Sequence, residues 1–576
     1  MKVKNIIKIV SGVLLAVMPS VTNAQVDKTV EVTKDYQPVL YGAMKLPVVP
    51  DMADTVKMRP EIDYGITPLM YSPELVTAHS FKPATVTYWD FNRPTNFYLK
   101  MGVGYPINTV GDFFMSTYNV RTGYLMAAAN HYGEFGKQNN WFGDRRNILK
   151  ASTTGRIAGG VYVGQRMFEG EVAYDSEVAR RYAAPLNAFA TNDSGVAEDP
   201  NLKAEYEVFK LKLRLGDDFQ DLSRTNFNID FFGDFFHDKS DWREADYKLQ
   251  MFDFGVGGKV GRRFQRHYLE GDVRYKNVSG IKDLRNHDNT VWAGLRYGYT
   301  ASRIDLLVGA DYCYDKPDVG HHYVLPYAKL LLNVTRNDSF IPFVEAEGVL
   351  KSNDYYSLAR HTIYVRYSED MTLLPNTLKY DFRAGFAGKF GRGRFGYRLY
   401  VGYSIADNAL YWYNYNYEWL QAVAAKQQVL TLNAELDYRP IDEIIVSAGI
   451  HGRFFKDYGE LYGFDMANGE SPLEALLKFR YRHRKFSVGA SARICGAAEW
   501  TVMHSFTPEG AEQPIMNLQN EKMPMYVDAG VDFEWNLKED WKIFVEGSNL
   551  ANMKIYDPAY FRQQGIRCTA GFKFTF

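Results

Sequence analysis

Alternation of apolar and polar residues is the feature that most constrains how this chain folds. Between Leu430 and Arg439, every second residue from Leu430 to Tyr438 is apolar or aromatic, and the residues between them are polar or charged. Val527 to Asn536 repeats the pattern. Successive side chains of a β-strand point to opposite faces, so each segment predicts a strand with one face for lipid and one for water. A soluble β-sandwich also alternates, so this pattern alone does not prove a membrane barrel.

The lengths of the connections separate the two possibilities. Brief polar turns are predicted at 391–393, 439–442, 483–484 and 537–540. They alternate with long connections at about 178–203, 351–377, 406–427, 455–473, 496–524 and 550–564. Short periplasmic turns and long external loops are typical of outer-membrane barrels. We therefore predict an all-β fold, a transmembrane antiparallel β-barrel of about 22 strands (range 18–22) over residues 96–576.

The N-terminus predicts export. Lys2, Lys4 and Lys8 precede an apolar run, and Thr22-Asn23-Ala24 offers a small-residue cleavage site, so residues 1–24 read as a signal peptide. No later stretch has the 18 or more apolar residues of a membrane-spanning helix. The 42 Tyr and 37 Phe suit strands and the aromatic girdles of a barrel. The expected location is the outer membrane of a Gram-negative cell, with membrane lipid as a partner.

Residues 25–95 form a different region. Eight of the chain's 22 prolines fall between Val26 and Thr95, a density that prevents long helices and central strands. We expect an extended segment that lies in the periplasm or occludes the barrel lumen.

The last segments carry a family resemblance. A hydrophobic strand from Trp541 enters the turn Asn549-Leu-Ala-Asn552, and a final strand from Gly565 ends at Phe576. This arrangement resembles the closing strands of TonB-dependent receptors. Phe572, Phe574 and Phe576 are similar to the C-terminal signal that barrel-assembly machinery recognises, which makes that machinery an expected partner. The same rings would also supply surface that faces lipid.

The chain departs from that family at its N-terminus. TonB-dependent receptors carry a globular plug before the barrel, whereas residues 25–95 lack the pattern of a plug, and we find no convincing energy-coupling box after the cleavage site. A barrel of about 22 strands is too wide for its own side chains to fill. We expect the lumen to be occluded by the proline-rich segment, by external loops folding inward, or by a partner protein.

Two groups of residues are candidates for function. The water-facing strand positions predict a charged lumen wall. These side chains could simply be hydrated and pair with one another, or they could guide a substrate through the lumen. These positions are Asp381, Arg383, Lys389, Arg398, Glu435, Asp437, Arg480, Arg482, Asp528, Asp532 and Glu534. The second group lies in a predicted external loop and would contact sugars or proteins, or would instead extend the wall above the membrane. It comprises Tyr411, Trp412, Tyr413, Tyr415, Tyr417 and Trp419.

No motif points to chemistry. The GxGxxG match at 391–396 is flanked by strands on both sides, so it reads as a hairpin turn. His321-His322 lacks a carboxylate pair at fixed spacing, and the three cysteines are far apart. We therefore expect no catalytic, cofactor-binding or metal site. Lys and Arg total 67 against 68 Asp and Glu, a balance that argues against a nucleic-acid partner.

The leading hypothesis is a plug-deficient barrel similar to TonB-dependent receptors, serving transport or acting as a subunit of an outer-membrane complex. The missing plug favours the second version, since a barrel occluded by partners needs no gate of its own. The open alternatives are a passive porin and, below it, an outer-membrane enzyme with residues on its loops.

Overall fold

A computed structural model describes residues 96–119, 122–164, 166–183, 203–217, 219, 221–241, 247, 249–284, 287–316, 320–335, 337–368, 374–391, 393–506 and 515–576. The predicted signal peptide (1–24) and proline-rich segment (25–95) lie outside these residues. Among the described residues, no helix is long and apolar enough to cross a membrane.

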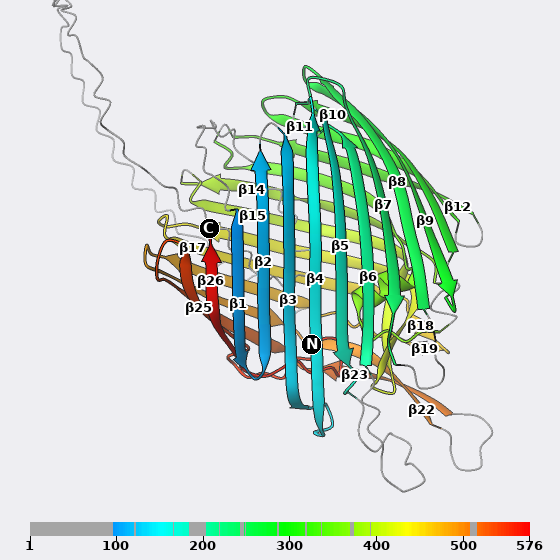
Figure 1. The fold of residues 1–576 in the computed structure, drawn as a ribbon. Coiled ribbons are helices and arrows are strands. Elements are labelled where there is room, and N and C mark those ends of the chain that lie inside the picture. Colours follow the sequence, from blue (N-terminus) through cyan, green and yellow to red (C-terminus); the bar gives the residue numbers. More distant parts are fainter. Residues whose placement is uncertain are drawn as a thin grey trace, which may run out of the picture. The chain divides into compact units, whose positions relative to one another are not determined.

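Twenty-two described strands form a closed antiparallel barrel, in which each strand pairs with its neighbours in the chain order and β26 pairs with β1 (Figure 1). The predicted fold class is therefore confirmed. The first eleven strands are β1 (Phe97–Tyr105), β2 (Asn108–Asn119), β3 (Gly123–Asn139), β4 (Arg145–Val163), β5 (Arg166–Arg180), β6 (Lys203–Gly216), β7 (Asn226–Asp238), β8 (Leu249–Phe264), β9 (His267–Lys282), β10 (His287–Thr300) and β11 (Ile304–Lys316). The other eleven are β12 (His321–Leu332), β13 (Ile341–Lys351), β14 (Thr377–Phe390), β15 (Phe395–Tyr415), β16 (Trp419–Tyr438), β17 (Ile444–Asp457), β20 (Leu473–Arg482), β21 (Phe486–Cys495), β24 (Tyr526–Asn536), β25 (Trp541–Ser548) and β26 (Arg567–Thr575).

Elements outside the wall fall in the long connections. They are the helix α2 (Tyr355–His361), the small hairpin β18 (Glu460–Leu461) and β19 (Phe464–Asp465), and the hairpin β22 (Ala498–Phe506) and β23 (Ile515–Met523). All of these connections leave the barrel at the same end, which we call the long-loop end. The opposite, short-turn end carries the predicted turns and the end of β26.

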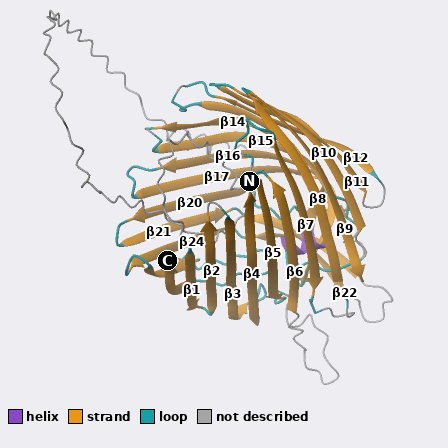
Figure 2. Cartoon of the chain, turned by 45° about the horizontal axis from the view of Figure 1, so that its top comes forward, coloured by secondary structure: helices purple, strands orange, loops and turns teal. Residues whose placement is uncertain are grey.

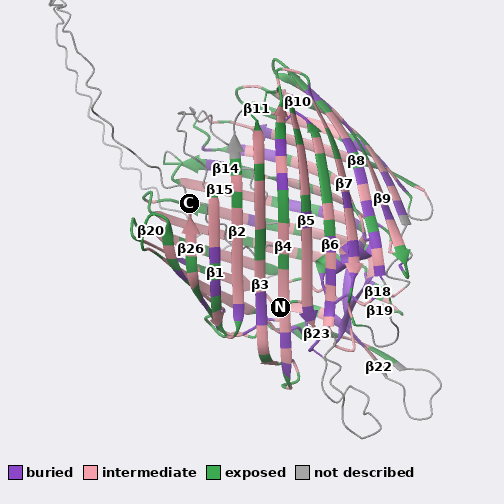
Figure 3. Cartoon of the chain, in the orientation of Figure 1, coloured by how far each residue is buried: buried purple, intermediate pink, exposed green. Residues whose placement is uncertain are grey.

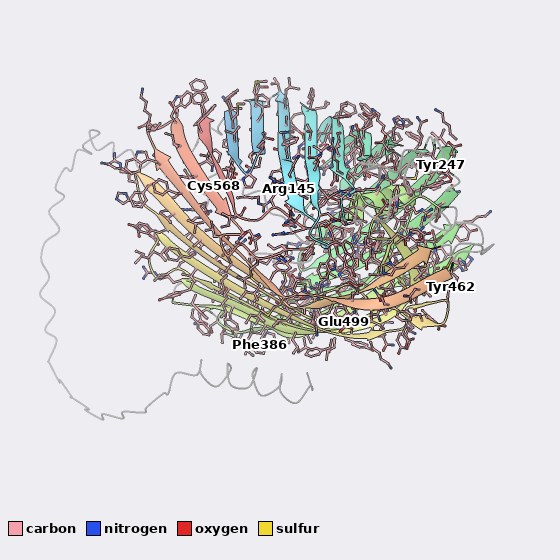
Figure 4. All side chains as sticks on the ribbon, turned by 90° about the horizontal axis from the view of Figure 1, so that it is seen from below. Arg145, Tyr247, Phe386, Tyr462, Glu499 and Cys568 are labelled. Atoms are coloured by element: carbon pink, nitrogen blue, oxygen red, sulfur yellow. The ribbon has the colours of Figure 1, made fainter. Side chains whose placement is uncertain are left out.

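The two faces of the wall have opposite chemistry. Large apolar side chains are exposed on the outer face: Val103 is 70% exposed, Leu295 61% and Ile157 60%. Phe386 also lies on the outside of the ring of strands seen in Figure 4. Acidic and basic side chains occupy the alternate positions of the same strands and pair with each other. An apolar band around a closed barrel is what a bilayer requires, because hydrocarbon offers no partner for an unpaired backbone group.

Aromatic rings gather at the short-turn ends of the strands. They include the pairs Phe390–Tyr397, Phe395–Tyr438, Phe486–Trp535 and Trp541–Phe574, whose ring centroids lie 4.7–6.4 Å apart. Such rings favour the boundary between hydrocarbon and water, so they mark one edge of the membrane-spanning band.

Candidate functional site: the closed mouth of the barrel

Residues at the ends of opposite strands touch across the long-loop end. In the ring of 22, β5 and β16 lie eleven steps apart in either direction. Yet the guanidinium of Arg181, which directly follows β5, lies 3.6 Å from the ring centroid of Trp419, the first residue of β16. One apolar cluster also joins inward positions of β4–β9 to Trp412, Leu420 and Ala422 of β15 and β16. The described loops therefore cross the mouth of the barrel.

Four segments make this closure, and we call them together the cap. They are residues 352–368, the upper part of the β15–β16 hairpin (409–425), the β22–β23 hairpin and residues 549–566. Buried residues gather at this end of the molecule (Figure 3). The cap's core is aromatic, and the described part of the wall below it is lined mainly by charges.

A small sheet forms the middle of the cap. β15 and β16 run past their neighbours, and a register shift between Ala406 and Ala409 marks where the hairpin leaves the wall. Asn408 at this point has a φ of 59°. Above the shift, Tyr413–Tyr415 pair in parallel with Thr501–Met503 of β22, and Val365 bridges Leu420 of β16. A bulge bends a strand and increases its twist, which turns the hairpin over the lumen.

The helix α2 holds residues 352–368 against the wall. Asp354 caps its N-terminus by accepting a hydrogen bond from the Ser357 backbone N–H at 2.8 Å. Tyr355 is fully buried and donates to Asp238 at 2.8 Å, and its neighbour Tyr356 packs on Phe236. Figure 2 shows α2 in purple behind β5 and β6. One edge of this segment is thereby fixed to the inner side of β7.

The base of the same connection is fixed at its other edge. The Asn376 side-chain amide donates to Asp288 of β10 at 2.8 Å and to Asp315 of β11 at 2.9 Å. Asn353 donates to the Pro375 carbonyl at 2.6 Å, which ties the start of the connection to its end. Asn376, Asp288 and Asp315 are all buried, so water does not compete for the hydrogen bonds between them.

Residues 549–566 close the last side of the mouth. Phe561 stacks on Tyr364 with ring centroids 3.6 Å apart and meets Tyr182 edge-on at 5.9 Å. The Tyr182 hydroxyl and the Gln138 amide both donate to the Arg562 carbonyl. This loop therefore contacts the end of β3 and the segments that follow β5 and β13.

The aromatic cluster at 411–419 does not form the predicted loop. β15 continues to Tyr415 and β16 begins at Trp419, so the long connection predicted at 406–427 is wrong. The two strands follow the wall only up to the register shift between Ala406 and Ala409, and above it the hairpin belongs to the cap. Tyr411, Trp412, Tyr413 and Trp419 are buried, and Tyr415 and Tyr417 are half-buried. Tyr417 lies at the hairpin tip, where its hydroxyl contacts His504 and Glu521 and its ring meets Phe142 at 4.7 Å. A role in external contact stays a prediction.

The predicted lumen-wall residues lie in a network of mixed charge. Arg383 pairs with Asp381, Arg398 with Glu345 at 3.5 Å, Arg480 with Asp532 at 3.5 Å and Lys573 with Glu534. Asp437 accepts from Ser447, Glu435 from Asn433, and Asp528 from the Asn549 backbone N–H, while Lys389 and Arg482 are exposed near the short-turn end. Sequence reasoning missed the partners on β13 and β26, since nothing local in the sequence shows which strands become neighbours.

The C-terminal aromatic residues lie on β26 and its end. Phe572 and Phe574 contact Trp541, and Phe576 is 77% exposed. Phe576 also extends the contact between β26 and β1: its terminal carboxylate oxygen accepts the backbone N–H groups of Asn96 and Phe97, each at 3.0 Å. Recognition of these rings by assembly machinery stays a prediction.

We expect His361 to give the cap a modest sensitivity to pH. Its ring stacks on Trp412 at 5.0 Å, while the residue remains open to water. Partial desolvation by the surrounding protein lowers the pKa of its imidazole below the usual value of 6.5, with Lys351 adding to the effect and Asp557 opposing it. A group whose folded-state pKa is lowered stabilises the fold above its unfolded pKa and loses that contribution as pH falls. Protection of residues 352–368 from hydrogen exchange, corrected for intrinsic rates, should therefore fall below about pH 6.5. H361F should keep the stacking and lose the pH dependence, and an unchanged pH dependence in H361F would refute this origin.

The fold and the closed mouth define an integral outer-membrane β-barrel. Its barrel resembles solved structures of TonB-dependent receptors, which confirms the predicted resemblance at the level of the fold. The FrpB iron transporter from Neisseria meningitidis is 12% identical, with 84% of this chain and 82% of that chain covered and a TM-score of 0.62. The pyoverdine receptor FpvA from Pseudomonas aeruginosa is 12% identical, with 84% of this chain and 78% of that chain covered and a TM-score of 0.60. The ferric-catecholate receptor Fiu from E. coli is 9% identical, with 84% of this chain and 82% of that chain covered and a TM-score of 0.58.

No family model and no curated protein matches the chain. Similarity at these identities concerns the fold. Within residues 96–576, the described part of the chain contains the barrel and its loops and no separate plug domain.

Proposed function

We propose that this chain is an outer-membrane transport barrel whose outer mouth is closed at rest by its own loops. One observation carries the proposal: the cap joins opposite sides of the ring, from Arg181 to Trp419, through a continuous aromatic core. A permanently open porin would have no use for such a closure. A barrel that must pass a solute only on demand needs one.

The lumen wall supports passage of a hydrated or charged solute. Its acidic and basic side chains pair in short ladders, such as Arg296 with Glu270 at 3.1 Å and with Asp311 at 3.2 Å. Rings and ladders of charge set the selectivity of many pores. The solved structures that resemble this chain include an iron transporter, a copper transporter and a pyoverdine receptor, which supports a transport role for this barrel as well.

Single-barrel conductance in a planar bilayer tests this function. The full chain should be closed most of the time. A variant in which residues 498–523 are replaced by a short Gly-Ser linker should conduct steadily, because the centre of the cap is gone. The matched control shortens only the connection 507–514, keeps β22 and β23, and should stay closed. If the wild type conducts steadily, a passive porin is favoured. If the variant without residues 498–523 shows no conductance, the lumen is not a transport pathway.

A second candidate function is a subunit of an outer-membrane complex, and the same closed mouth favours it. A barrel that never opens offers only its outer wall and loops as working surfaces. Co-purification in mild detergent separates the two functions, since a subunit should emerge with a partner at fixed stoichiometry and a transporter without one.

A further inference from the structure

The barrel wall has a weak joint between β12 and β13. Among the described wall strands this ladder is the shortest, with five residue pairs from Tyr327↔Glu347 to Leu331↔Phe343. The next shortest ladder, between β24 and β25, has six pairs. The ladders on either side have twelve pairs (β11–β12) and eleven pairs (β13–β14). Strand pairing is what closes a membrane barrel, so the wall is held least firmly here.

Two prolines explain the short ladder. Pro326 directly precedes the top pair on β12, and Pro342 directly precedes the bottom pair on β13. Proline has no N–H to give to a ladder and is normally confined to edge strands and bulges. Each proline therefore ends the pairing on its own side, and together they bracket it.

Above Pro326 the two strands touch without a ladder. His321–Leu325 pair with β11, and Gly348–Lys351 pair with β14. A methyl group on Gly348 would lie 2.8 Å from Pro326 Cδ and 2.9 Å from Leu325 Cα, so the chains are in close contact. The Tyr380 hydroxyl reaches over β13 and donates to the Val324 carbonyl at 3.3 Å. Side chains, and not backbone pairs, close this part of the wall.

Above the ladder the side chains at the joint are mainly apolar, whereas within the ladder Lys329 and Glu345 form an ion pair across the joint on its lumen side at 3.3 Å. Above the ladder, Cys313, Leu325 and Leu378 form a buried cluster with Tyr323 and Leu350 packed on it. Beside the ladder, Leu331, Ile341 and Phe343 form another. Val349, on the face that carries Glu345 and Glu347, is 44% exposed, and Val324 on the outer face is 60% exposed. The charged lumen wall thus has an apolar strip above the ladder, at the part of this joint where the two strands are not paired.

We propose that the β12–β13 joint is a lateral portal through which an amphiphile with an acyl chain passes between the lumen and the outer leaflet. The proposal rests on the proposed transport function and narrows its substrate to an amphiphile, whose charged or hydrated head group would follow the lumen wall while its acyl chain meets the apolar strip. While the cap closes the mouth, such a molecule in the upper lumen can leave only through the wall. An acyl chain crosses an apolar strip without leaving a charge unsolvated, whereas a polar solute would lose its hydration there.

An added β-strand from a partner protein fits the joint less well. Such a strand binds through free backbone groups on a sheet edge. Here the Val324 carbonyl is already engaged by Tyr380, and the cluster around Leu325 fills the space that an added strand would need.

A photo-crosslinking experiment tests the portal. Benzoylphenylalanine is placed at Val349 in the full chain, assembled in the outer membrane, and the adduct is identified by mass spectrometry. The same probe at Arg156, an exposed position that alternates with the lipid-facing Ile157 on β4, serves as the control. We expect an acyl-chain adduct at 349 and little at 156.

A disulfide across the ladder supplies the decisive comparison. In a background with Cys313, Cys495 and Cys568 replaced, A328C with A346C locks the joint, since these residues are ladder partners. The control lock, A384C with V401C, joins β14 to β15. The joint lock should reduce lipid adducts roughly tenfold, reversibly on reduction, since a restraint of about 1.4 kcal/mol suffices for that factor. The control lock should leave them unchanged.

Three outcomes would overturn the portal: a peptide adduct, no adduct at 349, or lipid adducts that the joint lock does not reduce. The conductance of the variant without residues 498–523 is independent of these results. If that barrel conducts while no lipid adduct forms, the portal fails and the transport function stands.

Discussion

Replacing Phe561 by alanine should open the cap without unfolding the barrel. Phe561 is 1% exposed and holds residues 549–566 to Tyr364 and Tyr182, while taking part in no strand of the wall. Truncating a buried phenylalanine costs about 3–5 kcal/mol. Because the strand pairing is untouched, that cost falls on the closed state of the cap. Each 1.4 kcal/mol is a factor of ten, so the open population should rise roughly a hundredfold or more.

Hydrogen exchange and bilayer conductance measure this effect together. Amides of 352–368 and 549–566 should lose protection in F561A, and openings should become frequent. F561L keeps most of the apolar volume and should lie close to wild type. F386A removes the same ring from the outer wall, where it is 40% exposed, and should leave the cap closed. Equal protection in F561A and F386A would show that the aromatic core does not hold the cap.

The strands of the wall were predictable because the residues of each strand alone show its alternation. A segment such as Leu430–Arg439 meets lipid on one face and water on the other, so its own residues reveal both its conformation and its orientation. The predicted number of 22 is the number observed. The turns at 391–393 and 483–484 were predictable for the same reason, since they separate two such segments by a few polar residues.

The cap was not predictable, because above the membrane the same rule no longer applies. Tyr411–Asn414 is buried on both faces, so no alternation distinguishes strand from loop there, and the sequence predicts a loop. The contacts that define the cap join Tyr364 to Phe561 and Tyr415 to Met503, positions far apart in the chain. A local signal existed only for α2, where Asn353-Asp354 and Ser357 mark a helix start.

The weak joint did leave a signal that the strand pattern hid. Pro326 and Pro342 lie inside β12 and β13, whose alternation alone predicts continuous strands. Both are strands, but each proline removes a donor at the same interface. The charged residues of the lumen wall were predictable only in part. Alternation predicts that they face the lumen, but it does not predict ion pairs such as Lys573 with Glu534, because these depend on which strands are neighbours.

Removing Phe576 should weaken the seam where β26 meets β1, although the eight residue pairs of that ladder remain. Phe576 accepts the N–H groups of Asn96 and Phe97 and donates its own N–H to the Phe97 carbonyl at 2.9 Å. Three backbone hydrogen bonds contribute roughly 2–4 kcal/mol in net terms, and more where lipid replaces water. Deleting Phe576 should therefore lower the ratio of folded to unfolded barrel at least about tenfold. The heat-modifiable migration of the folded barrel on a denaturing gel measures this ratio.

A point variant separates closure from recognition by assembly machinery. F576A keeps the backbone and its hydrogen bonds but loses the ring. If the machinery reads that ring, F576A should refold normally into detergent in vitro and yet accumulate poorly in the outer membrane of cells. F168A removes a ring that is 49% exposed on β5, away from the terminus, and should assemble normally in both settings. Normal assembly of F576A in cells would reduce the role of the last residue to closing the ladder between β26 and β1.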